Sequence, residues 1–220
     1  MVKVKICGIT NWTDARRAVE AGADFLGFNF YRQSSRYIAP AAARRIVKRL
    51  PEKVAAVGVF VNEREESICS IADGAGLTAV QMHGDDEDPH VADLVVEQRP
   101  RLKILAVISM HRTSPVGWAS AWDPDVVHAF LVDSGAQSGF GGTGETFDWR
   151  ASIQTLDEIR GFGQLVLAGG LTPENVGEAM GILRPWGVDV VSGVEASPGK
   201  KDPEKVRAFV RAVRDSERSL

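Results

Sequence analysis

Eight short apolar segments, each followed by a stretch with helical patterning, constrain the fold of this chain more than any other feature. The apolar segments are expected to be strands, at residues 3–7, 24–30, 54–60, 79–83, 103–108, 130–133, 164–168 and 188–192. Several are continuous apolar runs, which is typical of strands buried on both faces of a parallel sheet. Eight strand-helix units in 220 residues give a repeat of about 27 residues, which leaves room only for short loops.

The intervening segments carry recognisable helix ends. Asn11 predicts the cap of the first helix and Gly22 predicts its end. Thr172 and Asp202, each followed by proline, predict the starts of the last two helices. The other helices are expected at 40–50, 62–73, around 94–95, 116–122 and 148–159. Because strand and helix alternate throughout and no segment resembles a linker, we expect an α/β chain that forms a single-domain (β/α)8 TIM barrel over residues 1–220.

Composition narrows the kind of partner. The formal net charge is −3 and the isoelectric point is near 5.9, so the chain lacks the basic face that nucleic acid or an anionic membrane requires. No apolar run is long enough to span a membrane. We therefore expect a small-molecule substrate and no nucleic-acid or membrane partner, for a protein that is a monomer or a homodimer.

The cysteines and histidines indicate a reducing compartment and no metal. Cys7 ends a strand and Cys69 lies inside a predicted helix, so their contexts do not indicate a disulfide. Four histidines and two cysteines show no metal-ligand spacing, so we expect no metal site. The first residues begin a strand directly and include no apolar signal segment, which favours a cytoplasmic location.

Cys7 and Asp133 stand at the carboxyl ends of the first and sixth predicted strands. In barrels of this kind the carboxyl ends of the strands form the mouth, where catalytic groups gather. A thiol and a carboxylic acid at one mouth can exchange protons with a substrate if the site brings both pKa values toward neutrality. The residues alone leave two other interpretations open, in which Cys7 is a small buried side chain and Asp133 caps its own loop.

Two glycine-bearing turns follow the seventh and eighth strands. They are Gly169-Gly170 and Ser192-Gly193. Barrels of this class commonly bind phosphate at these two loops, on backbone N–H groups that an anion can approach closely where the residue is glycine. We therefore predict a phosphate-binding site there. The alternative is that both are ordinary tight turns.

Three further side chains are candidates for contact with the substrate. Arg36 follows the second strand, and its planar guanidinium can hold a carboxylate by two parallel hydrogen bonds; the alternative is a solvated loop arginine. Gln81 and His83 alternate at the end of the fourth strand, so they share one face, which we expect to be the barrel interior. A lone histidine at such a position is more often structural than catalytic.

Six motifs occur in order along nearly the whole chain. They lie at 5–10 (KICGIT), 30–38 (FY…SSRYI), 80–84 (VQMHG), 141–149 (GGTG…TFDW), 169–176 (GGLTPENV) and 191–202 (VSGVE…PGKKD). Any one of them would be a weak signal, but six at barrel-like spacing are specific. Together they resemble the phosphoribosylanthranilate isomerase family of tryptophan biosynthesis.

The resemblance implies an activity and the residues that perform it. The reaction is the Amadori rearrangement of N-(5-phosphoribosyl)anthranilate to 1-(2-carboxyphenylamino)-1-deoxyribulose 5-phosphate, without a metal or cofactor. By resemblance, Asp133 is the general acid that protonates the ribose ring oxygen, and Cys7 is the base that removes the C2′ proton. Arg36 matches the residue that holds the anthranilate carboxylate.

The resemblance also covers the rest of the pocket. Three residues of the glycine turns match the phosphate cradle, namely Gly170, Ser192 and Gly193. The loop 139–144 matches a mobile cover. Gln33 stands where the family has lysine, and Asn29 where an apolar residue is more usual. The anthranilate side of the pocket therefore departs from the family pattern more than the phosphate side does.

Two other functions remain open at this point. A sister barrel isomerase that acts on a histidine-pathway phosphoribosyl compound is expected to carry a carboxylate where this chain has Cys7, which counts against it. A non-catalytic phosphosugar-binding barrel would keep the glycine turns but would need neither Cys7 nor Asp133. Turnover of phosphoribosylanthranilate, followed by the loss of its fluorescence, separates the three.

Overall fold

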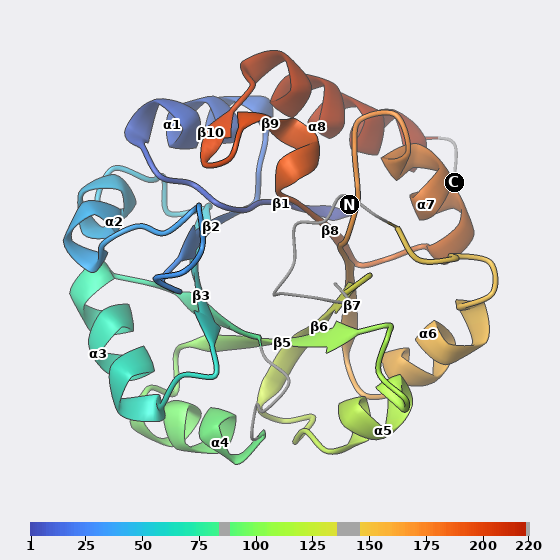
Figure 1. The fold of residues 1–220 in the computed structure, drawn as a ribbon, viewed down its shortest axis with the longest axis horizontal. Coiled ribbons are helices and arrows are strands. Elements are labelled where there is room, and N and C mark those ends of the chain that lie inside the picture. Colours follow the sequence, from blue (N-terminus) through green and yellow to red (C-terminus); the bar gives the residue numbers. More distant parts are fainter. Residues whose placement is uncertain (84–88, 136–145, 219–220) are drawn as a thin grey trace.

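The chain folds into a closed parallel barrel surrounded by helices. The structure, a computed structural model, describes residues 1–83, 89–135 and 146–218. Strands pair in chain order and β8 returns to pair with β1, so that Figure 1 shows an inner ring of strands inside a ring of helices. The strands are β1 (Lys3–Ile6), β2 (Phe25–Asn29), β3 (Ala55–Val61), β4 (Ala79–His83), β5 (Lys103–Ser109), β6 (Val127–Asp133), β7 (Gln164–Leu167) and β8 (Gly187–Val190). The predicted TIM barrel is confirmed.

Each strand is followed by a helix that covers the outside of the barrel. Within the described ranges these are α1 (Trp12–Ala21), α2 (Pro40–Val47), α3 (Glu65–Ala75), α4 (Pro89–Gln98), α5 (Pro115–Ser120), α6 (Ile153–Arg160), α7 (Val176–Leu183) and α8 (Pro203–Glu217). Two predicted caps are confirmed, because Asn11 Oδ1 accepts the Asp14 N–H at 2.9 Å and Asp202 Oδ1 accepts the Glu204 N–H at 2.8 Å. Gly22 ends α1 with a φ of 105°, as a left-handed cap requires.

The apolar side chains form two layers. The larger lies between strands and helices and includes Ile6 and Phe28. The smaller fills the barrel interior and includes Val57, Leu105 and Leu131. Because successive strand residues face opposite sides of the sheet, polar residues in step with the inner layer point into the barrel mouth. No helix in the described part of the chain is long and apolar enough to cross a membrane.

Three helices, α3, α6 and α7, begin later than the sequence predicts. The helix expected from residue 148 begins at Ile153, because the Asp148 carboxylate accepts the Ala151 N–H at 3.0 Å and closes a turn ahead of it. The helix expected from residue 62 begins at Glu65, because Asn62 has a φ of 48°, which lies outside the right-handed helical region.

The connection after β8 also differs from the prediction. The strand ends at Val190 rather than Ser192, because Val191 leaves the extended conformation with a ψ of −86°. Ser192 instead begins a short 3-10 helix. The segment up to α8 consists of η1 (Ser192–Val194) and a hairpin that the sequence did not predict, β9 (Glu195–Ser197) and β10 (Lys200–Lys201).

Candidate active site

The mouth of the barrel gathers the predicted acid, base and substrate-contact residues around one cavity. Its polar lining comes from the ends of four strands and from the loops that follow β1 and β2. These residues are Cys7, Asn29, Ser34, Arg36, Gln81, His83, Asp133 and Asp189. Side chains that are far apart in the sequence thus meet because the carboxyl ends of parallel strands share one edge.

Cys7 lies in a tight, charged corner of this cavity. A Cβ on Gly27 of β2 would come within 2.5 Å of Cys7 Sγ, so only glycine leaves room for the thiol. Lys5 lies two residues earlier on the same face of β1, so that its charge acts on the Cys7 side chain. Lys5 Nζ also pairs with Asp189 Oδ1 of β8 at 2.9 Å, and both side chains are almost fully buried. A buried ion pair therefore adjoins the thiol.

The surroundings of Cys7 act on its pKa in opposite directions. Burial raises the pKa of the thiol above its ordinary value, while the Lys5 ammonium acts to lower it. Burial acts to lower the pKa of Lys5, but the Asp189 carboxylate raises it above its usual value, so the ammonium keeps its charge. Lys5 therefore supplies the positive charge that a Cys7 thiolate needs in a buried site.

Asp133 faces the same cavity from the end of β6. Gly135 donates its backbone N–H to Asp133 Oδ1 at 2.8 Å, which is the local capping contact considered as an alternative role. The side chain nevertheless lines the cavity together with Cys7. The local contact thus orients a carboxyl group that also faces the mouth, so the two interpretations are compatible.

Gln81 and His83 both line the cavity, so the face that they share is the barrel interior, as expected. The Gln81 side-chain oxygen is buried and has no hydrogen-bond partner among the described residues. Leaving a buried acceptor unsatisfied costs about 1–3 kcal/mol. A ligand that places a donor against Gln81 Oε1 would remove this cost.

The two glycine turns pack against each other beside the mouth. Gly169 and Gly170 have φ values of 78° and 62°, in the left-handed region that favours glycine. A Cβ on Gly193 would lie 2.0 Å from the Leu171 carbonyl oxygen, so the turn after β8 touches the turn after β7 backbone to backbone. This close approach brings together the backbones of the two turns that were predicted to bind phosphate.

Asn175 holds the first of these turns, a role that the sequence did not predict. Its Oδ1 accepts the Thr172 N–H at 2.8 Å and its Nδ2 donates to the Gly170 carbonyl at 3.0 Å. The sequence predicted that α7 begins at Pro173. These contacts keep the segment in a turn, so α7 begins at Val176 instead.

The guanidinium of Arg36 is largely buried and is already engaged. Its side chain is only 17% exposed. Arg36 Nε donates to Glu195 Oε1 at 3.1 Å, and Nη2 donates to Glu195 Oε2 at 2.8 Å. The sequence predicted that this guanidinium holds a substrate carboxylate. Glu195 occupies the edge formed by Nε and Nη2, so the edge formed by Nη1 and Nη2 remains for a ligand.

The two departures from the family pattern lie in different places. Asn29 lines the mouth cavity, and its Oδ1 accepts the Tyr31 N–H at 2.9 Å. Gln33 is exposed, accepts the Tyr31 hydroxyl at 2.8 Å and lines a separate groove outside the mouth. Only Asn29 is therefore placed to contact a ligand in the cavity.

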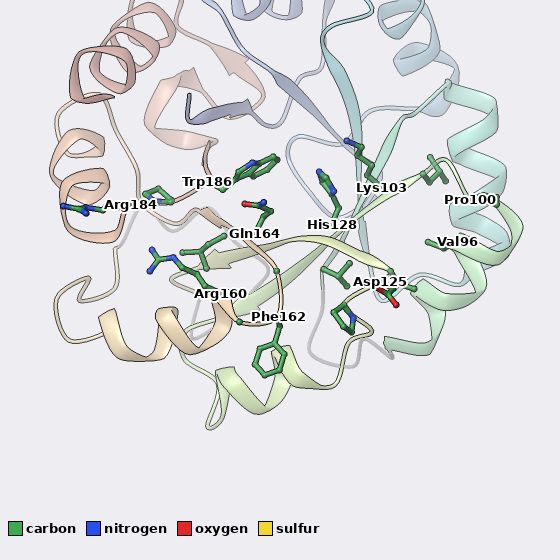
Figure 2. Close-up of a pocket in the computed structure, with 18 residues that line it drawn as sticks. Val96, Pro100, Lys103, Asp125, His128, Arg160, Phe162, Gln164, Arg184 and Trp186 are labelled. Carbon is green, nitrogen blue, oxygen red and sulfur yellow. The ribbon is translucent and has the colours of Figure 1, made fainter. Parts of the chain in front are cut away.

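A larger hollow, about 960 Å³, lies at the opposite end of the barrel, where the later strands begin. Figure 2 shows His128, Gln164 and Trp186 pointing toward one another across it. The His128 and Trp186 rings meet edge to face at 5.6 Å. This hollow contains none of the predicted site residues, and the amino-terminal face of such barrels serves stability rather than chemistry. Size therefore does not identify the site here.

Several residues that shape the site were not predicted from the sequence. Lys5 carried a usable signal, because it is in step with Cys7 on β1 and must face the same side. Its partner Asp189 is 184 residues away in the chain, and Glu195 is 159 residues from Arg36. Contacts over such separations cannot be inferred from local spacing in one sequence.

Comparisons with known proteins agree with this geometry. The family model described as N-(5′-phosphoribosyl)anthranilate isomerase matches residues 4–212. Relatives of that name include the proteins of Chlorobaculum tepidum, 44% identical over 100% of this chain and 98% of the relative, and of Citrifermentans bemidjiense, 45% identical over 96% of each.

Solved structures give the same result. The phosphoribosyl anthranilate isomerase of Thermotoga maritima matches with a TM-score of 0.87 at 42% identity, over 98% of this chain and 100% of that one. Another phosphoribosyl anthranilate isomerase, in complex with reduced 1-(o-carboxyphenylamino)-1-deoxyribulose 5-phosphate, matches with a TM-score of 0.82 at 39% identity over the same shares. This chain therefore belongs to the N-(5′-phosphoribosyl)anthranilate isomerase family.

Proposed function

We propose that this chain isomerises N-(5-phosphoribosyl)anthranilate to 1-(2-carboxyphenylamino)-1-deoxyribulose 5-phosphate in tryptophan biosynthesis, with Asp133 as the acid and Cys7 as the base. The observation that carries the proposal is that these two groups line one cavity at the barrel mouth, in a chain of this isomerase family. Acid-base chemistry alone accounts for every bond change, so the reaction needs no cofactor.

The reaction requires one proton to be delivered and one to be removed. Protonated Asp133 gives its proton to the ribose ring oxygen, the bond from that oxygen to C1′ breaks, and the anilino nitrogen lone pair forms the C1′=N iminium. The Cys7 thiolate then takes the C2′ proton, the C–H electrons form a C1′=C2′ double bond, and the iminium electrons return to nitrogen. The resulting enol becomes the ketone by gaining a proton at C1′ and losing the hydroxyl proton at C2′.

The two ends of the substrate are held by different parts of the mouth. The glycine turns, with Gly169, Gly170, Ser192 and Gly193, bind the phosphate, and the outer edge of Arg36 binds the anthranilate carboxylate. Gln81 Oε1, a buried acceptor, takes a hydrogen bond from the anilino N–H or a ribose hydroxyl, and His83 borders the same space. The predicted cover, residues 139–144, lies outside the described residues.

Turnover of phosphoribosylanthranilate by the purified chain tests the proposal. We expect the substrate fluorescence to disappear and the phosphorylated ketose to accumulate. Tight binding without turnover would instead indicate a phosphosugar-binding barrel. Turnover of a histidine-pathway phosphoribosyl compound alone would indicate the sister isomerase.

The pH dependence of the reaction tests the environment of Cys7. The base must be deprotonated to act, so kcat/KM is expected to rise with pH through the pKa of Cys7, which burial raises above its ordinary value. The charged groups that face the thiol are Lys5, Asp189 and Lys201. Replacing Lys5 with methionine removes the cation that stabilises the thiolate, so the rising limb should move to higher pH.

The control for this prediction is Lys3→Met on the same strand. Lys3 pairs with Asp24 at 3.1 Å at the amino-terminal end of β1, whereas Cys7 follows the other end of the strand. Loss of the Lys3 ammonium should leave the rising limb of kcat/KM at the same pH as in the unsubstituted chain. An unmoved limb in Lys5→Met would show that Lys5 does not influence the ionisation of the base.

Arg36→Met is expected to weaken binding of anthranilate-bearing ligands by roughly tenfold or more, while inorganic phosphate inhibits as before. The reason is that Arg36 and the glycine turns hold opposite ends of the substrate. Arg32→Met is the matched control, since Arg32 lies over the Tyr37 ring, 5.7 Å from its centroid, outside the mouth cavity. Equal losses of affinity for anthranilate-bearing ligands and for inorganic phosphate would indicate that Arg36 binds the phosphate instead.

We further propose that the protein acts in the cytoplasm as a monomer or a homodimer, on a small phosphoribosyl substrate and without a nucleic-acid partner. The related Thermotoga maritima enzyme is dimeric. Sedimentation of the purified chain at several concentrations measures which state is populated.

A further inference from the structure

A three-residue ion cluster lies behind the anthranilate side of the mouth. Glu195 accepts Arg36 Nε and Nη2 as described above, and its Oε1 also accepts Lys201 Nζ at 3.0 Å and the Gly199 N–H at 3.2 Å. The side chains of Glu195 and Lys201 are 4% and 1% exposed. Two cations share one carboxylate, so the cluster has a formal charge of +1, and one of its cations, Arg36, lines the cavity.

The cluster fixes which part of the Arg36 guanidinium is available. The Nε and Nη2 edge is held by Glu195. Nη1 makes only a long approach of 3.5 Å, to Ser35 Oγ, among the described residues. A guanidinium has two edges that can hold a carboxylate, and with one of them occupied only the edge of Nη1 and Nη2 can receive a ligand.

Glu195 also links the two ends of the predicted substrate site. It follows the turn Ser192–Val194 directly in the chain, and Gly193 of that turn contacts Leu171 of the other glycine turn. Arg36 lies in the loop after β2 and has no covalent connection to either turn. The ion pair therefore joins the Arg36 guanidinium directly to the segment that carries the turn after β8.

We infer that Glu195 is a positioning residue of this isomerase, which holds Arg36 so that its outer edge receives the substrate carboxylate while the adjoining turn receives the phosphate. The inference rests on the proposed function, since it concerns the role assigned there to Arg36. Arg36, and not Glu195, touches the ligand. Burial acts to raise the pKa of Glu195, but hydrogen bonds from Arg36 and Lys201 hold it below its usual value, so the carboxylate stays ionised.

Glu195→Gln tests this positioning with little change of shape. Among the described residues, the groups that hydrogen-bond the Glu195 carboxylate are all donors, namely Arg36 Nε and Nη2, Lys201 Nζ and the Gly199 N–H. A glutamine must turn its NH2 toward one of them. The least costly choice places the NH2 at the Oε2 position, because Oε1 also serves Lys201 and Gly199. This choice removes the Nη2 bond, so that the guanidinium is no longer held at two points.

The experiment measures the Kd of the reduced product analogue and inhibition by inorganic phosphate for four chains: unsubstituted, Arg36→Met, Glu195→Gln and the double variant. Glu195→Gln is expected to raise the Kd of the analogue by roughly tenfold, with phosphate inhibition unchanged. In the Arg36→Met background the same change should cost nothing more, because Glu195 acts through Arg36. Glu217→Gln is the matched control, since it loses an arginine pair, to Arg214 at 3.0 Å, far from the mouth.

The outcomes separate this inference from the proposed function. If Arg36→Met raises the Kd but Glu195→Gln does not, or if the loss from Glu195→Gln persists in the Arg36→Met background, the inference is overturned and the role of Arg36 stands. If Arg36→Met itself leaves the Kd of the analogue unchanged, the inference about Glu195 and the role assigned to Arg36 are both wrong. If circular dichroism shows that Glu195→Gln is not folded, Glu195→Asp replaces it, because the shorter side chain draws the carboxylate away from Arg36 and should raise the Kd in the same way.

Discussion

Cys7→Ala is expected to lower kcat by roughly 10²-fold or more while the affinity for the reduced product analogue stays nearly unchanged. The thiol is the group assigned to remove the C2′ proton, and alanine has no proton acceptor. Because the side chain is only 6% exposed and small, its loss should leave the barrel folded. Serine should rescue poorly, since a hydroxyl is far less acidic than a thiol. Single-turnover kinetics and analogue titration on the same preparations measure both quantities.

Asp133→Asn provides the second half of this test. Asparagine can still accept the Gly135 N–H through its side-chain oxygen, so the loop contact is kept while the acid is lost. The loss in kcat should be similar, again roughly 10²-fold or more.

Cys69→Ala is the matched control for Cys7→Ala, because Cys69 is also buried but lies in α3, away from the mouth. Near-normal turnover in Cys7→Ala would exclude the thiol from the mechanism and leave His83 as the next candidate base.

The barrel could be predicted from the sequence because each of its elements is specified locally. Apolar runs mark strands that are buried on both faces, and caps such as Asn11 and Asp202 mark helix starts through contacts within a few residues. The boundaries that were wrong depend on competing local bonds. Asp148 closes a turn before α6 can begin, for example, and such competition is not visible in residue type alone.

The candidate site was predicted as far as strand ends can predict it. Cys7, His83 and Asp133 meet at the mouth because each ends or directly follows a strand on the inward face, and Gln81 joins them because it lies two residues before His83 on that face. The residues that tune them were missed, since these contacts link segments distant in sequence. Lys5 was not among the predicted site residues, although it is one of the most buried side chains of the described residues.

Gly193→Ala is expected to raise the KM for substrate and the inhibition constant of inorganic phosphate by roughly 10²-fold each. The added methyl carbon would lie 2.0 Å from the Leu171 carbonyl oxygen and 3.0 Å from its carbonyl carbon. These neighbours are backbone atoms, so no change of side-chain rotamer can relieve the overlap. The two turns must move apart, and the backbone N–H groups that are assigned to the phosphate then no longer converge on one anion. In the unsubstituted chain, inorganic phosphate is expected to compete with the substrate.

The control for this prediction is another alanine replacement, Gly181→Ala in α7. A Cβ at that position meets nothing within 4 Å, and alanine in a helix interior is about 0.5–1 kcal/mol more favourable than glycine. The control should therefore keep its kinetic constants and unfold at slightly higher denaturant. Normal inhibition by phosphate in folded Gly193→Ala would mean that the anion is not bound between the two turns. Because Arg36 is not part of these turns, a rise in KM without a change in phosphate inhibition would instead locate the damage at the anthranilate end, through the neighbouring Glu195.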